Sequence, residues 1–383
     1  MKGMGIGVMA LVLVLSVFNG FESLVKQLYG VLDPEIRITA AEGKVFEFTD
    51  EDYEFIKSVN GVEEISMFLE ERVLVRYRDE EYLALVRGVD SRYEKVSDLK
   101  NYIVRGEYAL MDMGAPRAIL GAGVQRALNI QVEQSFHNLV LYVPNRTGRI
   151  SSINPDQAFN RRTIAPSSVF SIQQEFDNQY IFVPVTFMQE VLNYNEKTVT
   201  ALDIKLISGY NQNRVANQLR QLLSDEYVVQ TRYQLNETLY SIMQTEKWVV
   251  YAILTLILII AAFNIVGSLS MLVLEKKHDI AILQAMGATP NTIRNIFIAE
   301  GLIISLGGAL AGSLLAILIA FAQIHFELIK ISSSGSFVVS AYPVELQLLD
   351  FVLISVTVIF ISILASWFPA VRASRMKNLA KAE

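Results

Sequence analysis

The sequence predicts an α-helical membrane protein with four transmembrane helices and a large mixed α/β domain inserted between helices 1 and 2. Three uncharged runs, 248–274, 301–326 and 351–371, support this prediction. Each is at least as long as the roughly 20 apolar residues that a helix needs to cross a bilayer. Apolar residues make up 52% of the 383-residue chain and its mean hydropathy is +0.35, which is high for a soluble protein.

A fourth uncharged run, 3–21, has two interpretations. Lys2 and the apolar stretch 9–17 would suit a signal peptide, but the following FNGFES contains no small-residue cleavage site. We therefore prefer a transmembrane helix that begins almost at Met1, and we expect the natural start or a leader to lie upstream.

Lysine and arginine orient the helices. They are frequent in 275–295 and after residue 371, whereas 327–350 contains only Lys330. The positive-inside rule therefore places the first two segments in the cytoplasm. The predicted order is transmembrane helix 1 (1–21), outer domain (22–247), transmembrane helix 2 (248–274), cytoplasmic segment (275–295), transmembrane helix 3 (296–326), outer connection (327–350), transmembrane helix 4 (351–371) and cytoplasmic tail (372–383).

Strand and helix patterns occur near both ends of the outer domain. They predict strands at 35–40, 201–208 and 227–231, a hairpin over 64–90 that turns near Asp79, a helix at 51–59 capped by Thr49 or Asp50, and a helix at 213–224. The middle, about 117–180, is richer in short strands. We predict one α/β module interrupted by this inserted β-rich part.

Residues 144–166 predict a long loop, because they are rich in Pro, Gly, Asn and Ser. One acid, Asp156, accompanies four arginines: Arg146, Arg149, Arg161 and Arg162. A solvated loop and a docking arm for an acidic partner both remain open.

Residues 235–274 contain no proline and a single glycine, Gly267. One helix of about 60 Å could therefore link the outer domain to the membrane. Two helices broken near Thr245 are equally compatible with the pattern.

Composition excludes several functions. The net charge of −6 gives no electrostatic case for nucleic acid, and the chain has no cysteine. His137, His278 and His325 are far apart in sequence, and no Walker phosphate loop or nucleophile–base pattern occurs. We expect no catalytic residue, no metal site and no enzymatic activity.

The stretch EKKHDIAILQAMGATPNTI at 275–293 predicts two helices joined by a turn. Gly287 suits the end of the first, and Thr289-Pro290 suits the start of the second. Ile280, Leu283 and Met286 recur at intervals of three and predict an apolar ridge. A surface loop and a docking helix for a cytoplasmic subunit both remain open. The docking residues would be Glu275, Lys276, Lys277, His278, Asp279, Ile280, Leu283, Met286 and Gly287.

Small residues suggest close helix packing. Gly308, Gly312, Ala316 and Ala320 recur every four positions, which predicts a face for close contact with another helix. Gly3 and Gly7 suggest a second such face.

Two polar residues, Asn264 and Glu300, lie in or beside the apolar runs. Glu300 could snorkel or pair with Arg294 near the cytoplasmic interface. It could instead contact Asn264 inside the bundle in a manner that changes between states.

The pattern LEKKxDIAILQAMGATPxxI is very similar to the coupling segment of FtsX-like ABC transporter permeases, the MacB-like or type VII family. PAVRASRMKNLAK at 369–381 resembles that family's P-A-x-x-A-S-R ending. ALVLVLSVFNGFE at 10–22, GSFVVSAYPVELQLLDF at 335–351 and the order of segments are similar to the lipoprotein-releasing LolC/LolE branch. The resemblance covers essentially the whole chain.

This resemblance implies a bacterial inner-membrane permease with its large domain in the periplasm. It pairs with a second permease subunit, identical or related, and a separate LolD-like ATPase that binds ATP and Mg docks on the coupling helix. Lipoproteins leave the outer leaflet for a LolA-like periplasmic chaperone, and 144–166 lies where the family's chaperone-recruiting hook protrudes. Membrane lipid contacts are expected at the outer ends of helices 1 and 2. The chain itself is expected to bind no cofactor.

Three other functions remain open. A MacB-like permease would drive periplasmic efflux and bind an adaptor. An FtsX-like regulator would activate a cell-wall hydrolase, although its outer domain is usually smaller. A membrane receptor unrelated to ABC transporters would bind no ATPase at 275–290.

Overall fold

The computed structural model describes residues 2–132, 137–144, 159–330 and 341–375. The chain divides into two compact units. One contains Lys26–Thr238, and the other contains the long helices that precede and follow this range in the sequence. The helices of that second unit are α1 (Lys2–Tyr29, of which residues up to Val25 belong here), α9 (Glu237–Glu275), α10 (Lys277–Ala285), α11 (Pro290–Phe326) and α12 (Leu348–Ser374).

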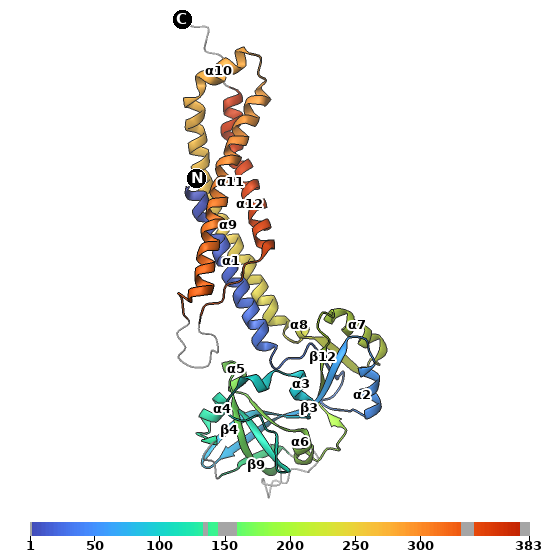
Figure 1. Cartoon of the computed structure of the whole chain (residues 1–383). Coiled ribbons are helices and arrows are strands. Elements are labelled where there is room, and N and C mark those ends of the chain that lie inside the picture. The colour runs from blue at the N-terminus through green and yellow to red at the C-terminus, as the bar shows by residue number, and fades with distance from the viewer. Residues whose placement is uncertain (1, 133–136, 145–158, 331–340, 376–383) are drawn as a thin grey trace, which may run out of the picture. The chain divides into compact units, whose positions relative to one another are not determined.

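Four of these helices, α1, α9, α11 and α12, are long and apolar enough to cross a membrane, as predicted. Figure 1 shows them running side by side. Helix α9 is continuous from Glu237 to Glu275, so the interpretation with a break near Thr245 is wrong. Both α1 and α9 extend beyond the apolar runs that predicted them.

The four-helix core explains why the first apolar run belongs with the others. Met4, Val8, Leu11 and Leu15 of α1 lie on one helical face and are almost completely buried. They pack with buried residues of α9, α11 and α12, including Leu258, Ala316 and Val358. This packing favours the transmembrane interpretation of α1.

The other unit is a mixed α/β domain. Its strands are β1 (Ile36–Ala40), β2 (Phe46–Glu47), β3 (Val62–Tyr77), β4 (Glu80–Val89), β5 (Ile103–Gly106), β6 (Met111–Asp112), β7 (Ala115–Gly121), β8 (Leu139–Pro144), β9 (Phe159–Phe170), β10 (Tyr180–Pro184), β11 (Thr198–Val199), β12 (Ala201–Leu206) and β13 (Tyr227–Thr231). Its helices are α2 (Asp50–Lys57), α3 (Tyr93–Val96), the 3₁₀ turn η1 (Leu99–Tyr102), α4 (Ala122–Ala127), α5 (Gln174–Asp177), α6 (Val185–Leu192), α7 (Gln212–Leu222) and α8 (Arg232–Leu235).

Segments from both ends of this domain form one antiparallel sheet in the order β13-β1-β12-β3. Helices α2 and α7 bury apolar residues against it, and Thr49 caps α2 as predicted, with Asp52 completing a capping box. On β1 and β12, Arg37 donates two hydrogen bonds of 2.6 and 3.0 Å to Asp203. The strand–helix–strand patterns therefore belong to a single module.

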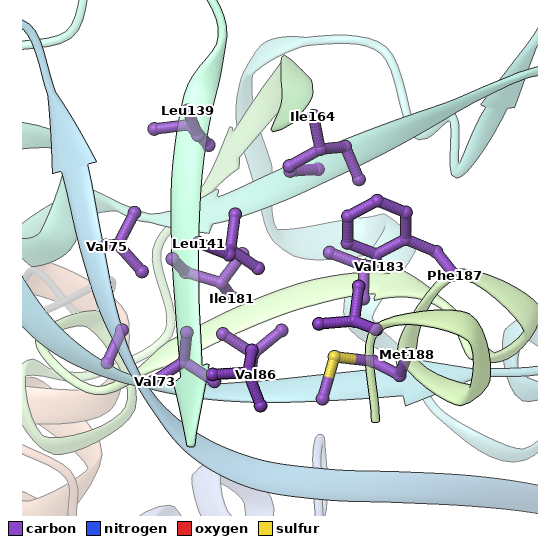
Figure 2. Packing of buried hydrophobic residues seen from close by; sticks show 14 of the residues in the cluster. Val73, Val75, Val86, Leu139, Leu141, Ile164, Ile181, Val183, Phe187 and Met188 are labelled. Carbon is purple, nitrogen blue, oxygen red and sulfur yellow. The ribbon is translucent and has the colours of Figure 1, made fainter. Parts of the chain in front are cut away.

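The inserted part is a closed ring of six strands. β3 pairs with β4 and β8, and the ring continues from β4 through β10, β7 and β9 back to β8. Figure 2 shows its interior, where buried side chains of the ring and of α6 point toward one another. The ring begins in the second half of β3, so the β-rich part extends beyond the predicted 117–180 at both ends.

One loop prediction is wrong in part. Residues 159–166, predicted as the end of a long loop, form the first part of β9 and pair with β8. Pairing satisfies the backbone groups of this polar stretch, so its composition did not prevent strand formation. The remainder of the predicted loop, 145–158, lies outside the described residues.

Candidate coupling site

The segment between α9 and α11 folds as a short helix and a tight turn. Gly287 has a φ of +96°, a left-handed conformation that glycine adopts without strain, and it comes directly after Met286, the C-cap of α10. Thr289 accepts a hydrogen bond from the backbone N–H of Thr292, and Pro290 occupies the first turn of α11. The predicted end of the first helix and start of the second are therefore both confirmed.

The three residues of the predicted apolar ridge differ in how far they are buried. Ile280 is 3% exposed and packs against Val273 of α9, Ile293 and Phe297 of α11, and Ala370 and Ala373 of α12. Its side chain anchors α10 to the chain's own helices. Ile280 is therefore not available to a partner, because periodicity along one helix does not show which face tertiary packing covers.

A different apolar surface remains open on α10. Ile282 is 47% exposed and Met286 is 72% exposed, one helical turn apart, whereas Leu283 is half-buried. The remaining predicted residues, Glu275, Lys276, Lys277, His278, Asp279 and Gly287, are all exposed. Apolar side chains bordered by charges are suited to contact with another protein.

The charges beside this surface are partly ordered. Lys276 contacts Asp279 at 3.0 Å, and this hydrogen bond raises the pKa of Lys276 above its usual value.

The small-residue face of α11 is buried as predicted. Gly308, Gly312, Ala316 and Ala320 all lie on it, and they pack in part against α1. A Cβ atom on Gly312 would lie 2.2 Å from the carbonyl oxygen of Gly5, so the two backbones touch at this point. Gly5 was not predicted as a contact, since it lies between Gly3 and Gly7 and outside their four-residue spacing.

Gly3 and Gly7 face α9 instead. A Cβ atom on Gly7 would lie 2.9 Å from Cδ1 of Leu258, and one on Gly3 would lie 3.7 Å from Nδ2 of Asn264. Asn264 is thus next to α1 and otherwise exposed.

Glu300 does not form either of the two contacts that the sequence predicted for it. Glu300 is half-buried, and within the described chain no hydrogen bond or ion pair joins it to Arg294 or Asn264. Arg294 lies over the ring of Trp367 instead, 5.3 Å from its centroid, which links α11 to α12 through a cation–π contact.

The predicted arginine cluster is divided. Arg146 and Arg149 lie outside the described residues, whereas Arg161 and Arg162 are consecutive on β9 and therefore project to opposite faces. Arg161 lies opposite Tyr142 of β8. Arg161 and Arg76 both lie over the Tyr142 ring, at 5.8 and 5.2 Å from its centroid.

Three further polar residues were missed. Asn19 of α1, Lys247 of α9 and Asp350 of α12 meet at one end of the four-helix unit. Lys247 and Asp350 border the apolar runs, where a charged residue by itself indicates only the end of the run. The described residues contain no group of three or more His, Asp or Glu side chains arranged to hold a metal ion.

The four apolar helices and the α/β domain define a multi-pass membrane protein with a large domain outside the bilayer-crossing segments. The model of the MacB-like periplasmic core domain matches residues 1–222, and that of the FtsX-like permease C-terminal region matches residues 251–377. The chain belongs to the family of FtsX-like permeases that carry a MacB-like periplasmic core domain.

Characterised relatives match almost the whole chain. The lipoprotein-releasing system transmembrane protein LolC of Buchnera aphidicola subsp. Schizaphis graminum is 27% identical over 96% of this chain and 88% of its own length. LolE of Haemophilus influenzae is 27% identical over 98% of this chain and 91% of its own length. The crystal structure of the periplasmic region of MacB from Actinobacillus actinomycetemcomitans aligns with a TM-score of 0.38 and 9% identity, covering 57% of this chain and 98% of that one.

Proposed function

We propose that this chain is the permease subunit of an ABC transporter that extracts lipoproteins from the outer leaflet of a bacterial inner membrane. A separate ATPase subunit, which binds ATP and Mg, drives it through α10. A second permease subunit, identical or related, completes the membrane part, and a periplasmic chaperone receives the lipoprotein.

The similarity to LolC and LolE over nearly the full chain carries this proposal. Similarity confined to one domain would support only the fold of that domain, whereas here the helices, the α/β domain and the segment between α9 and α11 all align. Within the chain, the exposed Ile282 and Met286 supply the apolar contact that an ATPase subunit needs.

Reconstitution tests the proposal. The chain is placed in proteoliposomes with its ATPase, its second permease subunit and a triacylated lipoprotein, and chaperone is added outside. We expect ATP-dependent transfer of the lipoprotein to the chaperone, and no transfer when the ATPase carries a disabled Walker lysine. Hydrolysis without any transfer would contradict the proposed substrate.

We assign chaperone docking to the surface formed by Arg161, Tyr142 and Arg76. Arg161 and Tyr142 are cross-strand neighbours, and both arginines hold their guanidinium groups over one aromatic ring. Aromatic and arginine side chains are the groups most often responsible for binding energy at interfaces. Arg76 also pairs with Glu81, so it is the charge of Arg161 that would suit an acidic chaperone surface.

Arg161→Glu is expected to weaken chaperone binding about tenfold, equivalent to ~1.4 kcal/mol, because it reverses the charge in the centre of this surface. Surface-plasmon resonance on the full chain in nanodiscs measures the change. Arg162→Glu is the matched control, since the same charge change occurs one residue along the strand on its other face. Equal weakening by both variants would show that the arginines act through general charge and not through this surface.

A further inference from the structure

The chain holds a buried polar contact where the outer ends of three membrane helices meet. Nδ2 of Asn19 on α1 donates a hydrogen bond of 2.5 Å to Asp350 of α12. Nζ of Lys247 on α9 donates a hydrogen bond of 2.7 Å to Oδ1 of Asn19 and lies 3.5 Å from Asp350. Each of the three side chains therefore contacts the other two.

This contact is poorly accessible to water. Asn19 is 1% exposed, and the side chains of Lys247 and Asp350 are 19% and 13% exposed. Removing one partner of such an ion pair leaves a buried charge without compensation, which is costly.

The segment 341–347, which leads into α12, reinforces one side of the contact. The backbone N–H of Glu345 donates to the carbonyl of Ser16 at 2.9 Å, and a Cβ atom on Gly20 would lie 2.5 Å from the carbonyl carbon of Pro343. Gln323 of α11 holds the other end, since its side-chain amide donates to the carbonyl of Tyr342. This segment therefore fastens α1 to α11 and α12 through several backbone contacts.

Helix α9 is attached differently. At this level it is joined to α1 through the Lys247 side chain, and one turn further along Tyr251 hydrogen-bonds to Thr357 of α12. The printed polar contact between α9 and α1 at this level is thus made by one flexible side chain, whereas α1 contacts the following segment through its backbone. Further along the helices, α9 also packs against α1 through apolar residues such as Leu258.

We propose that Asn19, Lys247 and Asp350 form a charge latch that holds the outer end of α9 against α1 and α12, and that separation of α1 from α9 requires this latch to open. The latch goes beyond the proposed function and does not depend on it. All three residues belong to one compact unit of this chain, so the latch requires neither a substrate nor a partner subunit.

The distance between the two helices tests the latch. The chain contains no cysteine, so Phe21→Cys on α1 and Val249→Cys on α9 provide a unique pair for spin labels. Both positions are exposed, at 48% and 52%, and pulsed electron–electron spectroscopy on the full chain in nanodiscs measures their separation. We expect one short distance in the otherwise unaltered protein.

Lys247→Met removes the cation while keeping side-chain length, and we expect a second population at longer distance. Asp350→Asn is a milder variant that keeps a hydrogen-bonding group of the same size and should show the same trend if Lys247→Met does not fold. The reciprocal exchange Lys247→Asp with Asp350→Lys should restore the short distance.

Lys330→Met is the matched control. It makes the same substitution at an exposed lysine that lies between α11 and α12 and is not part of the latch. It should leave the short distance unchanged. A distance distribution in the folded Lys247 or Asp350 variants that is identical to that of the unaltered protein would overturn the proposal. So would a shift of the same size in Lys330→Met.

Discussion

Ile282→Asp is expected to abolish productive binding of an ATPase subunit while leaving the membrane helices folded. Ile282 is exposed on α10 beside Met286, and an aspartate there would place a charge in the apolar centre of the contact. Loss of a central interface residue costs ~2 kcal/mol or more, about thirtyfold in affinity. Co-purification with the ATPase and stimulation of its hydrolysis by the chain both measure the effect.

Ile280→Asp provides the contrast within the same helix. Its side chain lies in the core formed by α9, α10, α11 and α12, so this substitution should lower the thermal unfolding midpoint in detergent. Ile282→Asp should leave that midpoint unchanged. The docking assignment would fail if Ile282→Asp retained full ATPase binding, or if it lost binding only together with its folded helices.

Gly312→Ala is expected to lower the stability of the helical unit by a large margin. The added methyl group would lie 2.2 Å from the carbonyl oxygen of Gly5, so α1 and α11 must move apart. Overpacking of this kind costs about 3 kcal/mol. The unfolding midpoint in nanodiscs should fall.

Gly267→Ala is the matched control. Gly267 lies within α9, and a Cβ atom there would meet nothing within 4 Å. Alanine is favoured over glycine in a helix by about 1 kcal/mol, so this variant should be as stable as the unaltered protein or slightly more so. Equal destabilisation by both substitutions would mean that the α1–α11 contact does not limit stability.

Local signals predicted much of the fold. The length of the apolar runs was sufficient to predict four long helices, since a bilayer-crossing segment needs little information from elsewhere in the chain. Thr49 and Thr289 likewise predicted where helices start, because a helix cap forms among residues that are close in sequence. Closure of the six-stranded ring was not predictable, since β3 and β8 pair across more than sixty intervening residues.

The candidate site shows a similar limit. The spacing of Ile280, Leu283 and Met286 predicted an apolar ridge, but packing of α11 and α12 decided that Ile280 is covered and Ile282 is open. Arg161 and Arg162 looked equivalent in a polar stretch, and strand pairing separated them. Lys247 and Asp350 looked like the borders of apolar runs, because their contact with Asn19 depends on how three helices meet.

The most direct test of the central claim is purification of the chain from its native membrane in mild detergent, followed by mass spectrometry of the proteins bound to it. We expect an ABC ATPase subunit together with triacylated lipoproteins and either one or two kinds of permease chain. An ATPase accompanied by a periplasmic adaptor would indicate efflux instead. Purification of the intact chain without any ATPase would contradict both the role of α10 and the proposed function.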